Sequence, residues 1–278
     1  MKQYCIWIVS PENLTHSKCY DEIAISLSHA FKALGIDAPI VRSVQEIKGC
    51  PVILGGIFLP QLGPVNLPAN SIVFNLEQIA ENSAGMDPAH IQLLRTFEVW
   101  DYNERNIEAL ANLGIDRTKL CGIGYVEALS SIPTAEHKDI DVLFYGSLND
   151  RRTSILQQLE KQNCKVSHVF GVYGKQRDDY IARSKIVLNL HFYPAKVFEI
   201  VRVSYLLANR VFVVSEDSPA ETCLTQLREG MAVCSYDNIV ETCLYYLGHE
   251  ASRQSIAEAG FNLFSQMRQE DYLRQCLN

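Results

Sequence analysis

The sequence of 278 residues lacks several features that would assign its class at once. No apolar run approaches the length of a transmembrane helix, and the stretch Met1–Val9 is too short for the apolar core of a signal peptide. Lys and Arg are scattered and the net charge is −7, which disfavours nucleic acid as a partner. We therefore expect a cytoplasmic protein with no membrane span.

Metal and cofactor motifs are also missing. None of the nine cysteines forms a C-x-x-C pair, no His/Cys group has zinc spacing, and an odd number of scattered cysteines indicates reduced thiols. Neither G-x-x-x-x-G-K-[ST] nor G-x-G-x-x-G occurs. Asp139 and Asp141 have D-x-D spacing, but they precede a strand and would lie at the edge opposite the ligand crevice. The sequence thus predicts no metal site and no cofactor.

What the chain does contain is an alternation of strand-like and helix-like segments. A hydrophobic content of 47% with 21% charged residues is typical of a globular protein, and the length suits two cores. We predict an α/β fold with two Rossmann-like domains facing across a cleft. The N-terminal domain covers 1–132 and the C-terminal domain 138–250, and a helical tail over 251–278 packs back on the first domain.

The expected elements follow from apolar runs and their stop signals. Strands are expected over 4–9, 38–42, 51–55, 71–75 and 97–100, and then over 140–145, 166–170, 186–190, 211–214 and 232–234. Helices are expected over 18–34, 88–96, 103–113, 153–162, 177–184 and 239–247, with a further helix start near Glu199.

The most informative stretch is Ile186–Glu216, where two buried strands flank a polar turn and a helix start. His191 and Lys196 lie in the turn, and Glu199 and Arg202 lie one helical turn apart. An α/β sheet presents its ligand crevice at such a place, which suits a negatively charged, ribose-bearing ligand. As an alternative, Glu199 only complements the helix dipole, so that its removal changes stability by at most about 1 kcal/mol. His191 has the alternative of a structural hydrogen bond.

A second candidate segment follows the strand at 140–145. Gly146 would let a ligand approach the backbone, and N–H groups near Ser147 at the following helix start would bind phosphate. Arg151 and Arg152 would add charge-assisted hydrogen bonds. The alternative is an ordinary strand-to-helix turn with Asp150 as the N-cap and the arginines on the surface.

Three residues of the N-terminal half follow predicted strands and could act as a general base toward an acceptor hydroxyl. They are His16, Glu77 and Asp101. Each could instead cap a helix or hold a loop, Asp101 most plainly. The sequence does not rank them as catalytic residues.

The order of the motifs resembles GT-B glycosyltransferases, in particular those related to spore-maturation and spore-coat glycosyltransferases. The matching residues are Gly146-Ser147, Asn149, Arg151-Arg152, Glu199, Arg202 and Ser215-Glu216. The resemblance implies a metal-independent transferase that binds a nucleotide sugar as its donor in the C-terminal domain. Gly146 and Ser147 would lie near the diphosphate, Arg202 or Lys196 would neutralise it, and Glu199 would bind the ribose.

The same resemblance leaves alternatives. Many GT-B enzymes carry a second acidic residue two turns further along the helix, whereas Ser204–Leu207 holds no carboxylate. A non-catalytic nucleotide-sugar-binding or scaffold protein is therefore one alternative, and a nucleotide-sugar epimerase on the same fold is another. The acceptor (glycan, lipid, protein or small molecule) is not specified by the sequence.

Overall fold

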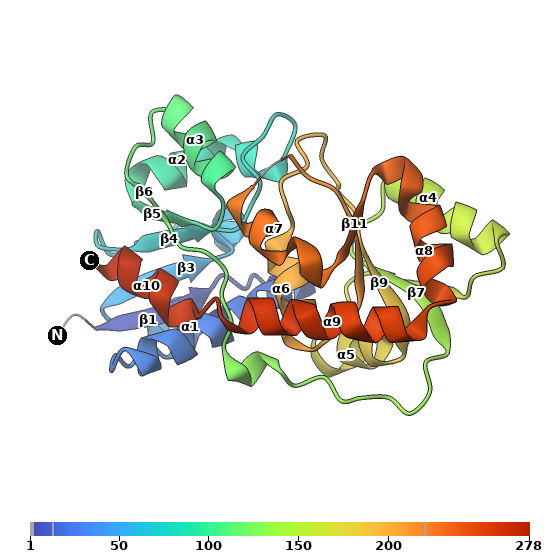
Figure 1. The fold of residues 1–278 in the computed structure, drawn as a ribbon. Coiled ribbons are helices and arrows are strands. Elements are labelled where there is room, and N and C mark those ends of the chain that lie inside the picture. Colours follow the sequence, from blue (N-terminus) through green and yellow to red (C-terminus); the bar gives the residue numbers. More distant parts are fainter. Residues whose placement is uncertain (1–2, 13, 220) are drawn as a thin grey trace. The chain divides into compact units, whose positions relative to one another are not determined.

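The structure is a computed structural model that describes residues 3–12, 14–219 and 221–278. It divides into two compact units (Figure 1). Unit 1 comprises Met1–Ala128 and Met267–Asn278, and unit 2 comprises Leu129–Gln266.

Unit 1 contains a parallel sheet with the strand order β2-β1-β3-β4-β5-β6. Its strands are β1 (Tyr4–Ile8), β2 (Ile40–Val41), β3 (Cys50–Leu54), β4 (Ile72–Asn75), β5 (Glu98–Asp101) and β6 (Thr118–Leu120). Its helices are η1 (Thr15–Tyr20), α1 (Asp21–Ala33), η2 (Val44–Glu46), η3 (Gly56–Leu62), η4 (Ala84–Met86), α2 (Pro88–Thr96), α3 (Glu104–Asn112) and α10 (Gln269–Leu277). Most strand residues are buried, as expected for a parallel sheet covered on both faces.

Unit 2 contains a second parallel sheet with the strand order β11-β10-β9-β7-β8. Its strands are β7 (Ile140–Tyr145), β8 (Val166–Val169), β9 (Ser184–Asn189), β10 (Val213–Glu216) and β11 (Ala232–Cys234). Its helices are α4 (Asp150–Lys161), α5 (Gly174–Ala182), α6 (Ile200–Ala208), α7 (Thr222–Leu227), η6 (Arg228–Gly230), η7 (Tyr236–Asn238), α8 (Ile239–Leu247) and α9 (Glu250–Ser265). The core joins Phe144 and Leu188 of the strands to Leu159 of α4.

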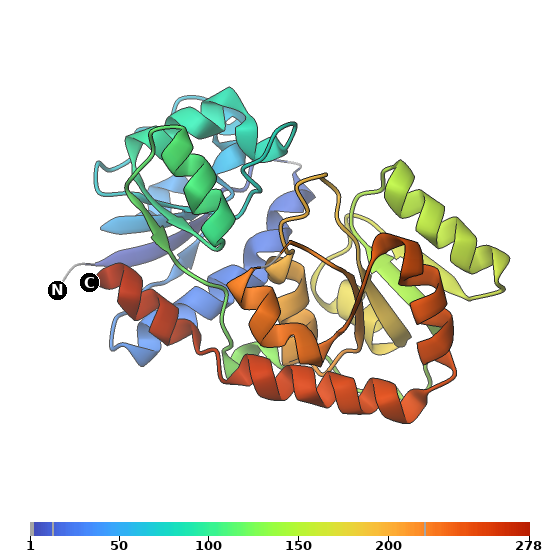
Figure 2. The same cartoon turned by 45° about the horizontal axis from the view of Figure 1, so that its top comes forward.

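Helix α9 packs closely within unit 2 (Figures 1 and 2). A Cβ on Gly230 would lie only 2.3 Å from Cα of Gly260, so the backbones of η6 and α9 touch where neither residue carries a side chain. The next helix, α10, packs against α1 of unit 1, where the buried side chain of Gln269 accepts a hydrogen bond from the N–H of Gly124 at 2.7 Å. The segment expected as one tail is thus two helices that belong to different units.

The predicted α/β class with two Rossmann-like parallel sheets is confirmed. All the expected strands occur, most of them within one or two residues of the expected bounds. Among the strands and α-helices of the described residues, β6 and α7 were not predicted, and neither were several short 3₁₀ helices such as η3. β6 has no apolar run, because its Thr-Lys-Leu residues are only half-buried beside β5.

Candidate functional site

The order of the strands in unit 2 creates a topological switch point, called the crevice point below, at the carboxyl edge of the sheet. β7 and β9 are neighbours, yet the strand after β7 lies on one side of this pair and the strand after β9 lies on the other. The loops that leave β7 and β9 therefore diverge from the same point, which is where α/β sheets bind their ligands. Both candidate segments of the C-terminal half begin there.

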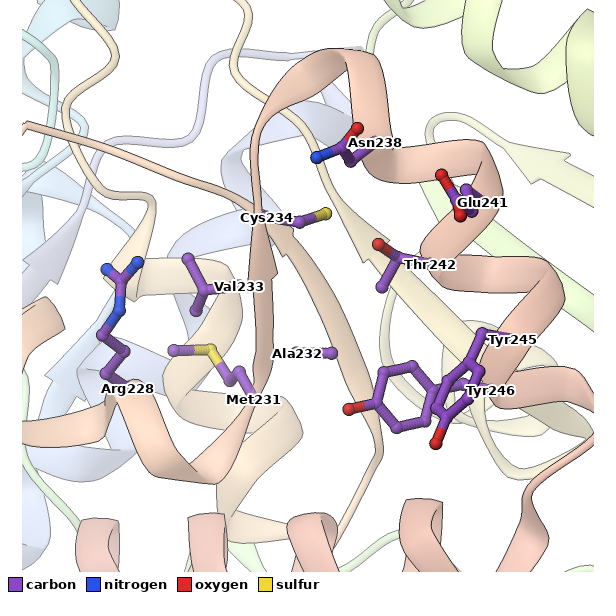
Figure 3. A pocket seen from close by; sticks show the side chains of 10 residues that line it. All are labelled: Arg228, Met231, Ala232, Val233, Cys234, Asn238, Glu241, Thr242, Tyr245 and Tyr246. Carbon is purple, nitrogen blue, oxygen red and sulfur yellow. The ribbon is translucent and has the colours of Figure 1, made fainter.

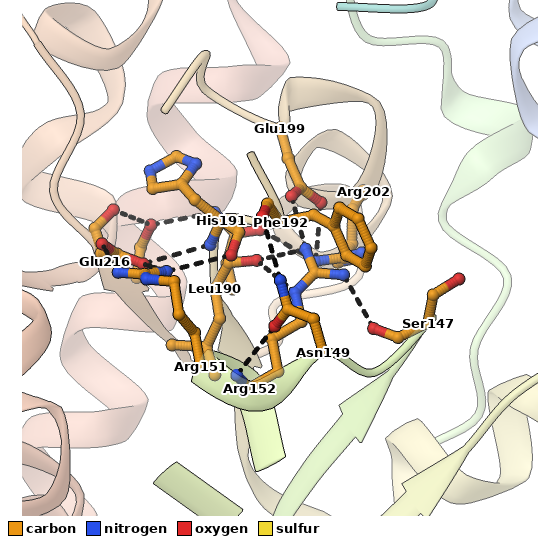
Figure 4. Close-up of polar contacts among 12 residues, drawn as sticks. Ser147, Asn149, Arg151, Arg152, Leu190, His191, Phe192, Glu199, Arg202 and Glu216 are labelled. Carbon is orange, nitrogen blue, oxygen red and sulfur yellow. Dashed lines mark hydrogen bonds and ion pairs between the residues drawn. The ribbon is translucent and has the colours of Figure 1, made fainter. Parts of the chain in front are cut away.

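Glu199 lies at the N-cap of α6 and is held by two arginines (Figure 4). Its Oε1 accepts a hydrogen bond from Nη2 of Arg152 at 2.7 Å, and its Oε2 lies 2.8 Å from Nη1 of Arg202. Its side chain caps no backbone N–H and is 16% exposed. Each oxygen keeps a lone pair, so the carboxylate is fixed in place and can still accept hydroxyl groups.

Arg152, which we expected to contact the ligand, is buried beneath this site. Its side chain is only 3% exposed, and it donates to the carbonyls of Ser147 at 2.9 Å and Leu190 at 3.0 Å. Burial lowers its pKa to about 10, so the guanidinium stays protonated at neutral pH. The geometry favours a positioning role for Arg152, because it ties the loops after β7 and β9 to Glu199.

Gly146 leaves space for the guanidinium of Arg202. Its φ is +136°, and a Cβ there would lie 3.0 Å from Nη2 of Arg202. Its N–H donates to the Val169 carbonyl at 3.0 Å, so the phosphate-binding N–H groups expected in this segment do not include that of Gly146. The next residue, Ser147, is exposed. The N-cap of α4 is Asn149, whose side chain accepts the N–H of Arg152 at 3.0 Å, and not Asp150.

A second carboxylate, Glu216, lies at the end of β10. Its side chain is 0% exposed, and Arg151 donates to both of its oxygens at 2.6 and 3.0 Å. Lys196 adds an ion pair at 2.9 Å. Burial alone would raise the pKa of Glu216, but the hydrogen bonds from Arg151 and Lys196 outweigh it and hold the pKa below its ordinary value. In the sequence, Glu216 stands out only as part of the Ser215-Glu216 motif, and its position at the end of a predicted strand is the signal that marks it as a site residue.

His191 is fully buried between these groups. Its Nε2 lies 2.9 Å from Oγ of Ser218, and its backbone N–H donates to Glu216 at 3.2 Å. Within the described part of the chain, its buried Nδ1 has no hydrogen-bond partner. Burial lowers the pKa of His191, so the imidazole is neutral at pH 7. The contact with Ser218 supports the structural alternative for His191.

These residues form a cluster with a net positive charge, although the protein as a whole is acidic. The cluster joins the cations of Arg151, Arg152, Lys196 and Arg202 to the carboxylates of Glu199 and Glu216. With His191 neutral, the cluster carries an excess of two positive charges, although the chain as a whole carries −7. A diphosphate group is opposite in sign to this excess and can balance it through charge-assisted hydrogen bonds.

In unit 1, the structure brings His16 and Glu77 to one aromatic cluster. The Tyr20 hydroxyl donates to Glu77 at 2.9 Å, and the ring of Phe58 lies 6.2 Å from Tyr20 and 6.0 Å from His16, centroid to centroid. Burial raises the pKa of Glu77, although the hydrogen bond from Tyr20 opposes this. The strand order reverses between β1 and β3, so this cluster lies at the corresponding crevice point of unit 1.

Asp101 is buried in the interior of unit 1. Its side chain is 0% exposed and accepts hydrogen bonds from Asn75 at 2.6 Å, Asn106 at 3.1 Å and the N–H of Asn103 at 2.9 Å. Burial raises its pKa to about 7, against the effect of these hydrogen bonds. The geometry favours the loop-holding alternative, because every one of these partners is internal.

A separate pocket of about 570 Å³ lies between β11 and α8 (Figure 3). It is lined by Arg228, Met231, Ala232, Val233, Cys234, Asn238, Glu241, Thr242, Tyr245 and Tyr246. None of the residues predicted from the sequence as a site lines this pocket.

Residues 3–12, 14–219 and 221–278 contain neither a metal-binding cluster nor a membrane-spanning helix. No group of three or more His, Cys, Asp or Glu in these ranges is arranged to hold a metal ion. Asp139 and Asp141 are paired with Arg183 and Lys185, each at 2.7 Å. No helix in these ranges has both the length and the apolar character needed to cross a membrane.

Comparison with known proteins places the chain among glycosyltransferase folds. T4 phage β-glucosyltransferase superposes with a TM-score of 0.61 at 10% identity, covering 100% of both chains. A mutant of T4 phage BGT in complex with UDP-glucose gives a TM-score of 0.65 at 11% identity with the same coverage. Anabaena HepE in complex with UDP and glucose gives 0.62 at 9% identity, covering 100% of this chain and 98% of HepE. The fold is therefore of the GT-B type.

The sequence relatives share more identical residues with this chain than the solved structures do. An uncharacterized protein of Acanthamoeba polyphaga mimivirus, L140, is 27% identical over 193 residues, which cover 65% of this chain and 60% of L140. A second one, L138, is 28% identical over 144 residues, 51% of this chain but 14% of L138. The chain thus spans less than two thirds of either relative. The profile of the family described as "Glycosyl transferase-like" matches residues 125–273. The chain belongs to this glycosyl transferase-like family.

Proposed function

We propose that this protein transfers a sugar from a nucleotide-activated donor to an acceptor, and that unit 2 binds the nucleotide. One observation carries the proposal: an excess of two positive charges surrounds a fixed carboxylate at the crevice point of the unit 2 sheet. A nucleoside diphosphate needs both features, cations for its phosphates and a hydrogen-bond acceptor for its ribose.

The roles follow from exposure and remaining hydrogen-bonding capacity. Glu199 accepts hydrogen bonds from the ribose hydroxyls, because each of its oxygens keeps a free lone pair in addition to the one that pairs with an arginine. Arg202 and Lys196 neutralise the leaving diphosphate, so the reaction needs no divalent metal. The complexes of BGT with UDP-glucose and of HepE with UDP and glucose support a uridine diphosphate sugar as the donor.

The acceptor is deprotonated by unit 1 in this proposal. Glu77 is the stronger base candidate, because it is only half-buried and Tyr20 orients it. His16 belongs to the same cluster, whereas Asp101 is enclosed. The glycosyl transferase-like family and the similarity to T4 phage β-glucosyltransferase favour a transferase over an epimerase. The motif order supports membership of the spore-coat-related group, and the scattered free cysteines support a cytoplasmic location.

The test is the binding of UDP and UDP-glucose, measured by thermal shift and calorimetry, with GDP and ADP for comparison. A ligand at 100 times its dissociation constant should stabilise the protein by about 2.7 kcal/mol. Arg202→Gln should abolish most of this shift. Arg183→Gln, which removes an exposed arginine paired with Asp139, should leave it unchanged. A wild-type protein that none of these nucleotides stabilises would refute the proposed function.

A further inference from the structure

Lys196 is held in a backbone conformation that costs the protein stability. It ends the turn Tyr193–Lys196, in which its N–H donates to the Tyr193 carbonyl at 3.2 Å, and its φ is +51°. A residue with a Cβ is strained in this left-handed region, which glycine occupies without penalty. Residues held in such conformations occur more often at active sites and ligand clamps than elsewhere.

Lys196 has the most exposed side chain among the four cations of the cluster. It is 38% exposed, compared with 33% for Arg151, 14% for Arg202 and 3% for Arg152. Arg152 and Arg202 also bind Glu199, and Arg202 fills the space beside Gly146. These two arginines are therefore fixed, while Lys196, on a flexible side chain, makes one ion pair with the residues that the structure describes.

Glu216 does not depend on Lys196 for its charge balance. Arg151 donates to both carboxylate oxygens, and the N–H of His191 donates to Oε2 at 3.2 Å. The guanidinium of Arg151 is itself fixed, because it lies over the ring of Tyr236 at 4.1 Å. If Lys196 left, Glu216 would still be paired and hydrogen-bonded.

We propose that Lys196 exchanges partners during donor binding, leaving Glu216 for the diphosphate, and that its left-handed backbone is retained to place the ammonium group within reach of both. This proposal rests on the proposed function and names the residue that responds to the donor. Glu216 acts as the resting partner, and Arg151 keeps it neutralised after the exchange.

The experiment separates charge from backbone strain with paired variants. Lys196→Gln removes the charge and keeps the strain, whereas Lys196→Gly removes both. Arg210 provides a matched control, because it has a φ of +53° and its ion pair, with Glu258, lies outside the cluster. Each of Lys196→Gln, Lys196→Gly, Arg210→Gln and Arg210→Gly is measured for its melting temperature and for its affinity for UDP.

Both Lys196 variants should bind UDP about tenfold more weakly than wild type, or worse, as expected for the loss of a charge-assisted hydrogen bond. Lys196→Gly should melt roughly 2–4 °C above Lys196→Gln, since glycine relieves the strain. The Arg210 pair should show a similar difference in melting temperature with unchanged UDP affinity.

Each remaining outcome is decisive. If wild type binds UDP and both Lys196 variants bind it equally well, the exchange is wrong while the proposed function stands. If the Lys196 variants lose affinity but melt at the same temperature, the backbone part is overturned. If wild type binds neither UDP nor any other nucleotide tested, the proposed function fails and the exchange fails with it.

Discussion

Glu199→Ala should destabilise unit 2 far more than a helix-start carboxylate would. The sequence alone suggested at most about 1 kcal/mol. In the structure, removing Glu199 leaves the guanidinium of Arg152, which is 3% exposed, without its counter-charge. Breaking a buried ion pair from one side typically costs 3–5 kcal/mol. Because Arg152 keeps its hydrogen bonds to the Leu190 and Ser147 carbonyls, we expect a loss of about 3 kcal/mol.

The assay is urea unfolding followed by circular dichroism, with a matched surface pair as the control. Glu258 lies 2.9 Å from Arg210, and these side chains are 51% and 48% exposed. Glu258→Ala should therefore change stability by less than about 1 kcal/mol, as exposed pairs do.

A double mutant tests the stated cause. Combining Glu199→Ala with Arg152→Met removes both charges, so the losses should be non-additive by roughly 2 kcal/mol. A Glu199→Ala loss no larger than that of Glu258→Ala, or strict additivity in the double mutant, would refute the reasoning.

Three other outcomes are expected. The pKa of Asp101 is raised to about 7, so the folded state holds this proton to higher pH than the unfolded chain does. The stability that Asp101 contributes is therefore full below about pH 4 and is lost as the pH rises to about 7. Asp101→Asn should flatten that part of the stability profile, and an unchanged slope would count against the shift. Glu77→Gln should lower turnover of UDP-glucose 10²–10⁴-fold by the usual magnitude for a general base, with UDP affinity kept; wild-type turnover would exclude Glu77. EDTA should not change the UDP-induced melting shift, and its loss would contradict metal independence.

The alternation of apolar runs in the sequence was enough to predict the class and most elements. Periodicity and stop signals are local properties, so β7, α2, β11 and α8 were placed without any tertiary information. The same reasoning directed attention to the loops after 140–145 and 186–190, because ligand crevices lie at the carboxyl ends of parallel strands. β6 was not predicted, because its residues are only partly buried, next to β5, and its sequence therefore has no apolar pattern of its own.

The partners of each side chain were decided only by the tertiary structure. Arg152 and Glu199 are 47 positions apart, and Arg151 and Glu216 are 65 apart, and both pairs meet only because β7, β9 and β10 are neighbours in the sheet. Strand order is a long-range choice that local patterns do not encode. The sequence therefore determined which residues lie at the edge of the sheet. Their burial and pairing decided that Arg152 is buried beneath the site and that Glu216 is the second carboxylate.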